Sequence, residues 1–181
     1  LGKNVVNCYR GYRLFVHVAA AGLTACMVLT GIDWWFFSNT RSEYLRPLVY
    51  GAGIGGFFVP VLLPFILYVY AEARANTRFR YFSAAIAQSV IVAWCISSFY
   101  KALTGRIEPE FISHLEMVDR SRVFNFGFFE YGIFWGWPSS HTAVAFALAA
   151  AIVVFTSRKA PVGIAAVGYA FFIGLGAAIG F

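Results

Sequence analysis

The residues best suited to chemistry in this chain are two hydroxyls and an imidazole that follow a proline. They lie in the run Trp137-Pro138-Ser139-Ser140-His141-Thr142, which opens a long apolar segment. A helix that begins here would present unpaired backbone N–H groups and a partial positive charge, and both favour phosphate binding. A histidine at the same place can give a proton to the group that leaves the phosphate. The run therefore predicts phosphoryl chemistry.

Two basic side chains precede this run and could hold the same anion. Lys101 stands at the end of an apolar segment, and Arg106 follows in the next polar stretch. The transition state of phosphoryl transfer spreads negative charge over the equatorial oxygens, so fixed cations and N–H donors stabilise it. The expected phosphate ligands are Lys101, Arg106, Ser139 and Ser140. His141 is the expected catalytic residue, a general acid of a kind typically worth about 10²- to 10⁴-fold in rate.

Each of these residues also has a purely structural alternative. The two serines could serve only as a helix cap after the proline. His141 could be a hydrogen-bonded histidine at the membrane interface, and Lys101 could extend its ammonium group toward water from a helix end. Arg106 could be an ordinary surface residue of a loop. The combination of His141 with Pro138 and Lys101 at these spacings favours the functional interpretation.

The composition indicates that an integral membrane protein carries these residues. Of the 181 residues, 60% are hydrophobic, 19% aromatic and only 12% charged, and the mean hydropathy is +0.71. Soluble domains carry about 25% charged residues. Windows of about 20 apolar residues, the length that spans hydrocarbon, indicate five transmembrane helices. They cover residues 14–32, 48–71, 81–100, 141–157 and 161–181. We therefore expect an all-α, multi-pass transmembrane helical bundle, with residues 1–181 forming a single domain.

The distribution of lysine and arginine orients this bundle. The N-terminus, residues 72–80 and residues 158–159 together hold eight basic residues against one acid, which favours the cytoplasmic side. Residues 33–47 and 101–140 hold six basic residues against seven acids, and we expect them to be loops on the opposite side. The predicted site then lies outside the cytoplasm, near the outer membrane–water interface, in what we expect to be a bacterial inner membrane.

Other classes of protein and site are disfavoured. The net charge of +6 arises from short basic clusters between apolar runs, a pattern that argues against a nucleic-acid partner. The three cysteines are widely spaced and indicate neither a disulfide framework nor a metal site. The three histidines show no paired ligand spacing and no aspartate-rich cluster accompanies them. We therefore expect metal-independent turnover and no cofactor.

Two further patterns predict packing and not chemistry. Gly51, Gly53, Gly55 and Gly56 lack the preceding strand and following lysine of a nucleotide-binding loop. They predict close helix packing or a bend with Pro60 and Pro64. His17, inside the first predicted helix, is expected to be a packed, hydrogen-bonded residue.

The two candidate motifs together resemble those of a known family. Lys101-Ala-Leu-Thr-Gly-Arg106-Ile-Glu-Pro109, with Pro138-Ser139-Ser140-His141 further along the chain, resembles the first two signature motifs of the type 2 phosphatidic acid phosphatase (PAP2) superfamily. These are membrane phosphatases that act on lipid phosphates. The family pattern is Lys, six residues, Arg, Pro for the first motif, and Pro-Ser-Gly-His, often with a second Ser, for the second. The five predicted helices are similar to the family's six-helix core without its last member.

The chain departs from the family pattern in two places. Glu108 stands where the first motif has its arginine, and Arg106 is the nearest guanidinium. The third motif (Ser-Arg, five residues, His, three residues, Asp) is absent. In the family this motif follows the fifth helix and supplies the nucleophilic histidine, so the resemblance implies a phosphohistidine intermediate and a chain truncated before that motif. We expect the 181 residues alone to be inactive.

The resemblance implies hydrolysis of a phosphomonoester or diphosphate on a membrane lipid. Phosphatidic acid, phosphatidylglycerol phosphate, a polyprenyl diphosphate and a lipid A phosphate are all candidate substrates. Two alternatives stay open: a lipid phosphotransferase of the same fold, and a membrane protein that binds lipid phosphates without turnover. A transporter is less favoured, because no charged residue lies deep in a predicted helix.

Overall fold

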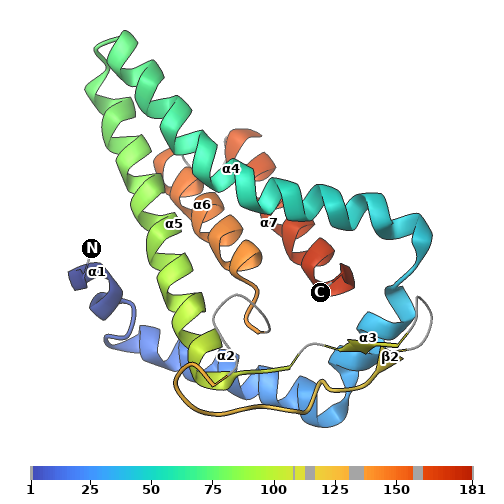
Figure 1. Ribbon diagram of the computed structural model, residues 1–181. Coiled ribbons are helices and arrows are strands. Elements are labelled where there is room, and N and C mark those ends of the chain that lie inside the picture. The colour runs from blue at the N-terminus through green and yellow to red at the C-terminus, as the bar shows by residue number, and fades with distance from the viewer. Residues whose placement is uncertain (1, 108, 113–116, 131–136, 157–160, 181) are drawn as a thin grey trace. The chain divides into compact units, whose positions relative to one another are not determined.

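The computed structural model describes residues 2–107, 109–112, 117–130, 137–156 and 161–180 (Figure 1). The described residues divide into two compact units, the larger formed by Ser42–Ser97 and Ser139–Gly180 and the smaller by residues 2–41 and Ser98–Pro138. The elements are α1 (Gly2–Asn7), α2 (Tyr12–Thr30), α3 (Ile32–Thr40), a 3-10 turn η1 (Glu43–Leu45), α4 (Arg46–Ala73), α5 (Thr77–Thr104), β1 (Glu110–Phe111), β2 (Met117–Val118), α6 (Ser140–Thr156) and α7 (Pro161–Gly180).

Helices dominate the described chain, which confirms the predicted all-α class. Among the described residues, β1 and β2, two residues each, pair in an antiparallel ribbon, and Arg106 forms an isolated antiparallel bridge with Phe124. Four helical segments of the described residues are long and apolar enough to cross a membrane: Tyr12–Thr30, Glu43–Ala73, Thr77–Thr104 and Pro161–Gly180. The protein is therefore a multi-pass membrane protein. Four of the five predicted spans correspond to these segments.

Helix α6 corresponds to the remaining predicted span. It is apolar but has 17 residues, about 26 Å at 1.5 Å per residue, which is a little less than the thickness of the hydrocarbon core of about 30 Å. Its first residues carry the motif of interest, so the start of α6 fixes where that motif lies.

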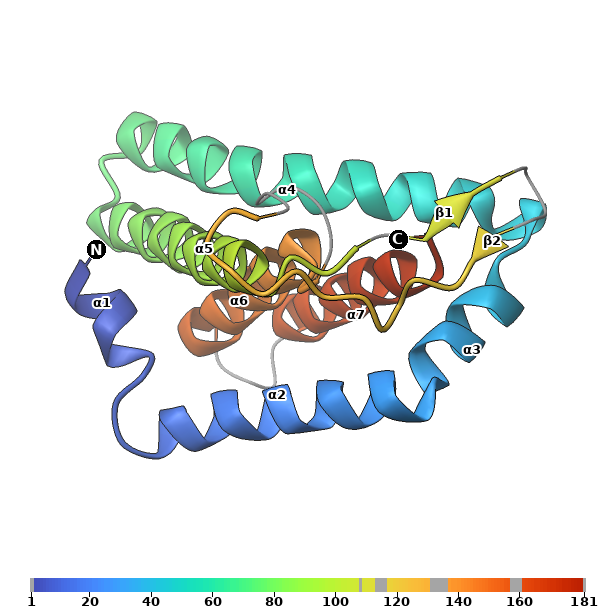
Figure 2. The ribbon, with the colours of Figure 1, turned by 60° about the horizontal axis from the view of Figure 1, so that its bottom comes forward.

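The larger unit has its core where α4, α6 and α7 pack together. Figures 1 and 2 show α6 and α7 side by side. Ala145, Leu148, Ala170 and Ile173 are almost fully buried in this core, and Phe82 of α5 stacks on Phe155 with ring centroids 4.0 Å apart. Both α6 and α7 are apolar around their whole circumference, as expected of helices that face protein on one side and lipid on the other.

Close packing by glycine, predicted from the sequence of α4, is confirmed at three of its four glycines. A Cβ atom at Gly51, Gly55 or Gly56 would contact side chains of α6 or α7, whereas one at Gly53 would meet nothing within 4 Å. Small residues let helix backbones approach closely in a membrane protein. Three of these glycines therefore hold α4 against its neighbours.

In the smaller unit, α2 bends into α3 at Gly31 (Figure 2). Gly31 has φ +75°, the left-handed conformation that commonly ends a helix at a glycine. The expectation of a loop over residues 33–47 was therefore wrong for its first part, which forms α3. Asp33 lies in the first turn of α3, where a carboxylate is favoured by the helix dipole. The hydroxyl of Thr40 donates to the Phe36 carbonyl at 2.7 Å.

His17 of α2 lies in an aromatic cluster of the smaller unit. Its Nδ1 is 2.9 Å from the hydroxyl of Tyr100, and the ring of Tyr9 stacks on it with centroids 4.6 Å apart. Burial and a hydrogen bond with Tyr100 raise the pKa of Tyr9 above its ordinary value. The prediction that His17 is a packed, hydrogen-bonded residue is confirmed.

Candidate functional site

The start of α6 presents the second motif in the geometry of a capped helix. Ser139 is the capping residue: its Oγ accepts a hydrogen bond from the N–H of Thr142 at 3.4 Å, and its carbonyl accepts from the N–H of Ala143 at 3.0 Å. Ser140 and His141 then occupy the first two positions of the helix. Backbone N–H groups at these positions have no acceptor within a helix, so they are suited to an anion. Ser139 can therefore cap α6 while the first N–H groups of the helix bind an anion.

A serine of α5 contacts this motif from a neighbouring helix. The hydroxyl of Ser97 donates to the Trp94 carbonyl at 3.0 Å, and its Oγ is hydrogen bonded to the Oγ of Ser140 at 3.1 Å. Ser97 is 2% exposed. Ser97 was not predicted as a site residue, although its place one helical turn before Lys101 was a usable signal, because residues four apart share a helix face.

The first motif begins at the C-terminal end of α5. Lys101 lies in the last turn of that helix and is 7% exposed. A cation in this turn is favoured by the helix dipole. Burial at this level is unusual for lysine and is seen where the ammonium group is paired.

The chain that follows returns to cover the end of α5. The N–H groups of Gly127 and Phe129 donate to the carbonyls of Leu103 and Ala102 at 3.1 and 3.0 Å, which satisfies groups that a helix end leaves without partners. Gly105 has φ +48° and its backbone is packed against Asn125 so closely that a side chain would not fit. The first motif therefore sits in a segment whose backbone is held in place.

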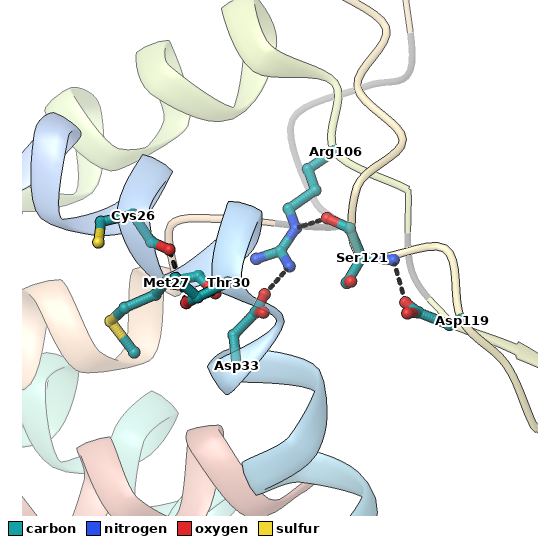
Figure 3. Close-up of polar contacts among 7 residues, drawn as sticks. All are labelled: Cys26, Met27, Thr30, Asp33, Arg106, Asp119 and Ser121. Atoms are coloured by element: carbon teal, nitrogen blue, oxygen red, sulfur yellow. Dashed lines mark hydrogen bonds and ion pairs between the residues drawn. The ribbon is translucent and has the colours of Figure 1, made fainter.

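Arg106 binds two groups of the protein itself (Figure 3). Its NH2 group forms an ion pair with the carboxylate of Asp33, and its Nε donates to the Ser121 carbonyl at 2.9 Å. The side chains of Arg106 and Asp33 are 15% and 18% exposed. Two buried oxygens beside this pair, Asp33 Oδ1 and Ser121 Oγ, have no hydrogen-bond partner within the described chain. Asp33 and Ser121 were not predicted as neighbours of Arg106, since they are 73 and 15 residues from it along the chain.

The predicted site residues thus fall into two groups. Ser139, Ser140 and His141 belong to the larger unit, and Lys101 and Arg106 belong to the smaller unit. A single phosphate site shared by both groups stays a prediction. Glu108 lies outside the described residues, as do residues 131–136 before Trp137.

Among the described residues, no three His, Cys, Asp or Glu side chains gather as ligands of a metal ion. Cys8, Cys26 and Cys95 are free thiols. The chemical groups at hand in the two motifs are therefore cations, hydroxyls, helix N–H groups and one imidazole. These are groups that bind and protonate phosphate esters.

The apolar helices, with these groups at the start of one of them, define a multi-pass membrane protein suited to phosphate chemistry. The sequence model of the PAP2 superfamily matches residues 82–181, more than half of the chain and including both motifs. The chain belongs to the PAP2 superfamily. Members of this superfamily are phosphatases, so a phosphatase-type function is supported in general terms. No curated protein and no solved structure matches the chain.

Proposed function

We propose that the full-length protein is a membrane phosphatase that hydrolyses a phosphomonoester or diphosphate of a membrane lipid. The observation that carries this proposal is the position of His141, two residues after the capping Ser139 at the start of α6 and within the region matched by the superfamily. At that point a phosphoryl group would meet helix N–H donors and a proton-carrying side chain together.

The proposed reaction has two steps. A histidine of the family's third motif attacks phosphorus, and the bond from phosphorus to the lipid oxygen breaks while His141 gives that oxygen a proton. Water then attacks phosphorus and gives a proton back to His141, while the bond from phosphorus to the histidine nitrogen breaks. Inorganic phosphate is released and the nucleophilic histidine is regenerated. Lys101, Arg106 and the N–H groups beside Ser140 neutralise the phosphoryl oxygens in both steps.

The site is proposed to face the exterior of a bacterial inner membrane. The support is the charge distribution of the sequence, with basic residues concentrated in the N-terminus, residues 72–80 and residues 158–159. Vanadate, a phosphate-like anion that does not cross bilayers readily, tests this orientation. Added outside sealed, right-side-out vesicles, it should inhibit turnover; inhibition confined to inverted vesicles would contradict the orientation.

The reaction itself is tested with the full-length protein in lipid vesicles and radiolabelled lipid phosphates. Release of labelled inorganic phosphate that continues in the presence of EDTA supports a metal-independent hydrolase. Label that moves to a second lipid or a sugar indicates a phosphotransferase. Binding of the labelled lipid without any product indicates the non-catalytic alternative.

A further inference from the structure

Gly56 of α4 lies directly against the imidazole-bearing residue of the second motif. It is buried, and a Cβ atom placed on it would lie 3.0 Å from Cβ and 3.2 Å from Cδ2 of His141. The same atom would lie 3.0 Å from Cγ2 of Ile173 on α7. Carbon atoms pack best at about 3.5–4.0 Å. The glycine therefore leaves the space that the His141 ring occupies, and any larger residue would take part of it.

This contact limits how the imidazole can turn. Cδ2 is the ring atom that a Cβ on Gly56 would contact, at 3.2 Å. A ring flipped by half a turn would place a nitrogen there, and a ring nitrogen next to a C–H group loses a hydrogen bond. The residue at position 56 therefore limits the orientations that the His141 ring can adopt.

A second contact fixes the helix that carries the ring. Ser97 of α5 is hydrogen bonded to Ser140, the residue before His141, at 3.1 Å. The start of α6 is thus held by α5 through Ser140 and by α4 through His141, and all of these residues belong to the larger unit. Support of this kind from neighbouring elements is what keeps a catalytic group within about 0.5 Å of its working position.

We infer that Gly56 is a positioning residue for His141, keeping its imidazole where it can protonate the leaving oxygen. This inference rests on the proposed function, since it takes His141 to be the general acid. It concerns a residue outside both motifs and outside residues 82–181, the region matched by the superfamily.

The test compares Gly56→Ala with Gly53→Ala in the full-length protein. Both variants add one methyl group to α4 and both gain the same helix propensity. At Gly53, however, the new Cβ meets nothing within 4 Å. Each variant is assayed on dioctanoyl phosphatidic acid, whose alkoxide needs a proton to leave, and on p-nitrophenyl phosphate, whose phenolate leaves without one.

A displaced general acid has a distinctive effect on these two substrates. A displacement of 1 Å can cost about 10²-fold in rate, so a shift of a few tenths of an ångström in Gly56→Ala should lower kcat on phosphatidic acid about tenfold. The kcat on p-nitrophenyl phosphate should fall by less than about threefold, and KM for both should change little, because the acid acts on the leaving group. Gly53→Ala should match the wild-type protein on both substrates.

Equal losses on the two substrates, or no loss, would overturn the inference, because a general packing defect does not distinguish leaving groups. His141→Ala serves as the reference for the proposed function. If His141→Ala lacks the same substrate preference, His141 is not the general acid, and the proposed function fails independently of Gly56.

A second variant keeps the test valid if Gly56→Ala does not fold. Gly56→Ala combined with Ile173→Ala removes the contact with α7 and leaves the contact with His141. The double variant should show the same selective loss on phosphatidic acid. A wild-type ratio of the two activities in a folded double variant would contradict the positioning role.

Discussion

Arg106 and Asp33 form an ion pair that joins the first motif to the first turn of α3. The guanidinium expected to bind phosphate is thus already bound to a carboxylate and to the carbonyl of Ser121. A planar guanidinium has five N–H donors, so it can keep these contacts and still offer one to an anion. Asp33 is therefore expected to hold Arg106 in place, and its effect on stability can be measured.

We predict that Asp33→Asn lowers the thermal stability of the protein. Removing the charge leaves the guanidinium, only 15% exposed, without its counter-ion, at a cost of about 2 kcal/mol. For a protein of this size that corresponds to about 4–8 °C in Tm. The measurement is a thermal unfolding curve in detergent.

The matched control is Glu110→Gln, which breaks the ion pair with Arg120 in the same unit. The side chains of that pair are 43% and 53% exposed, and exposed pairs contribute at most about 1 kcal/mol. Its Tm should change less than that of Asp33→Asn. Equal shifts in the two variants would show that burial does not strengthen the Arg106 pair.

Arg106 should also contribute to anion binding. We predict that Arg106→Ala raises the Kd for vanadate by about tenfold or more, since a charge-assisted hydrogen bond contributes about 1.5–3 kcal/mol. Arg120→Ala, the removal of an exposed arginine of the same unit, should change the Kd far less. Glu108→Ala should leave vanadate binding equal or stronger, because an acid repels the anion. Weaker binding in Glu108→Ala than in Arg106→Ala would show that the wrong residue was assigned to phosphate.

Replacement of His141 is expected to have the largest effect on turnover. In the full-length protein, we predict that His141→Ala lowers kcat for a lipid phosphate by about two to four orders of magnitude. Expression and Tm should stay near wild-type values, because the side chain is only partly buried. Near-normal turnover in a folded variant would remove His141 from the mechanism.

The sequence was sufficient to predict features that depend on local composition. Apolar runs located the spans of α2, α4, α5 and α7, and the proline-serine run located the start of α6 at its capping residue Ser139. It failed at α3 (Ile32–Thr40), where residues 33–47 were expected to form a loop. Hydrogen bonds from the side chains of this segment to its own carbonyls instead accompany a helix.

Contacts between distant segments were beyond the reach of sequence patterns. Asp33 and Arg106 are separated by 73 residues and Ser97 and Ser140 by 43, so no local periodicity links the members of either pair. The glycines of α4 signalled close packing, but only the fold shows that Gly56 packs on His141 while Gly53 contacts nothing. The roles of these residues therefore follow from tertiary packing.

Ser97 offers a last test of how the second motif is held. Replacing it with alanine removes the hydrogen bond with Ser140, a net loss of about 0.5–1.5 kcal/mol. If Ser97 positions the start of α6 for catalysis, Ser97→Ala should lower kcat by about three- to tenfold with little change in KM. Ser89→Ala is the control, because the hydroxyl of Ser89 on the same helix donates to the Ala85 carbonyl of its own helix at 2.9 Å. The effect should disappear when Ser140→Ala is already present, since the two hydroxyls then no longer interact. If Ser97→Ala lowers kcat equally in the wild-type protein and in Ser140→Ala, Ser97 acts on stability and not through the second motif.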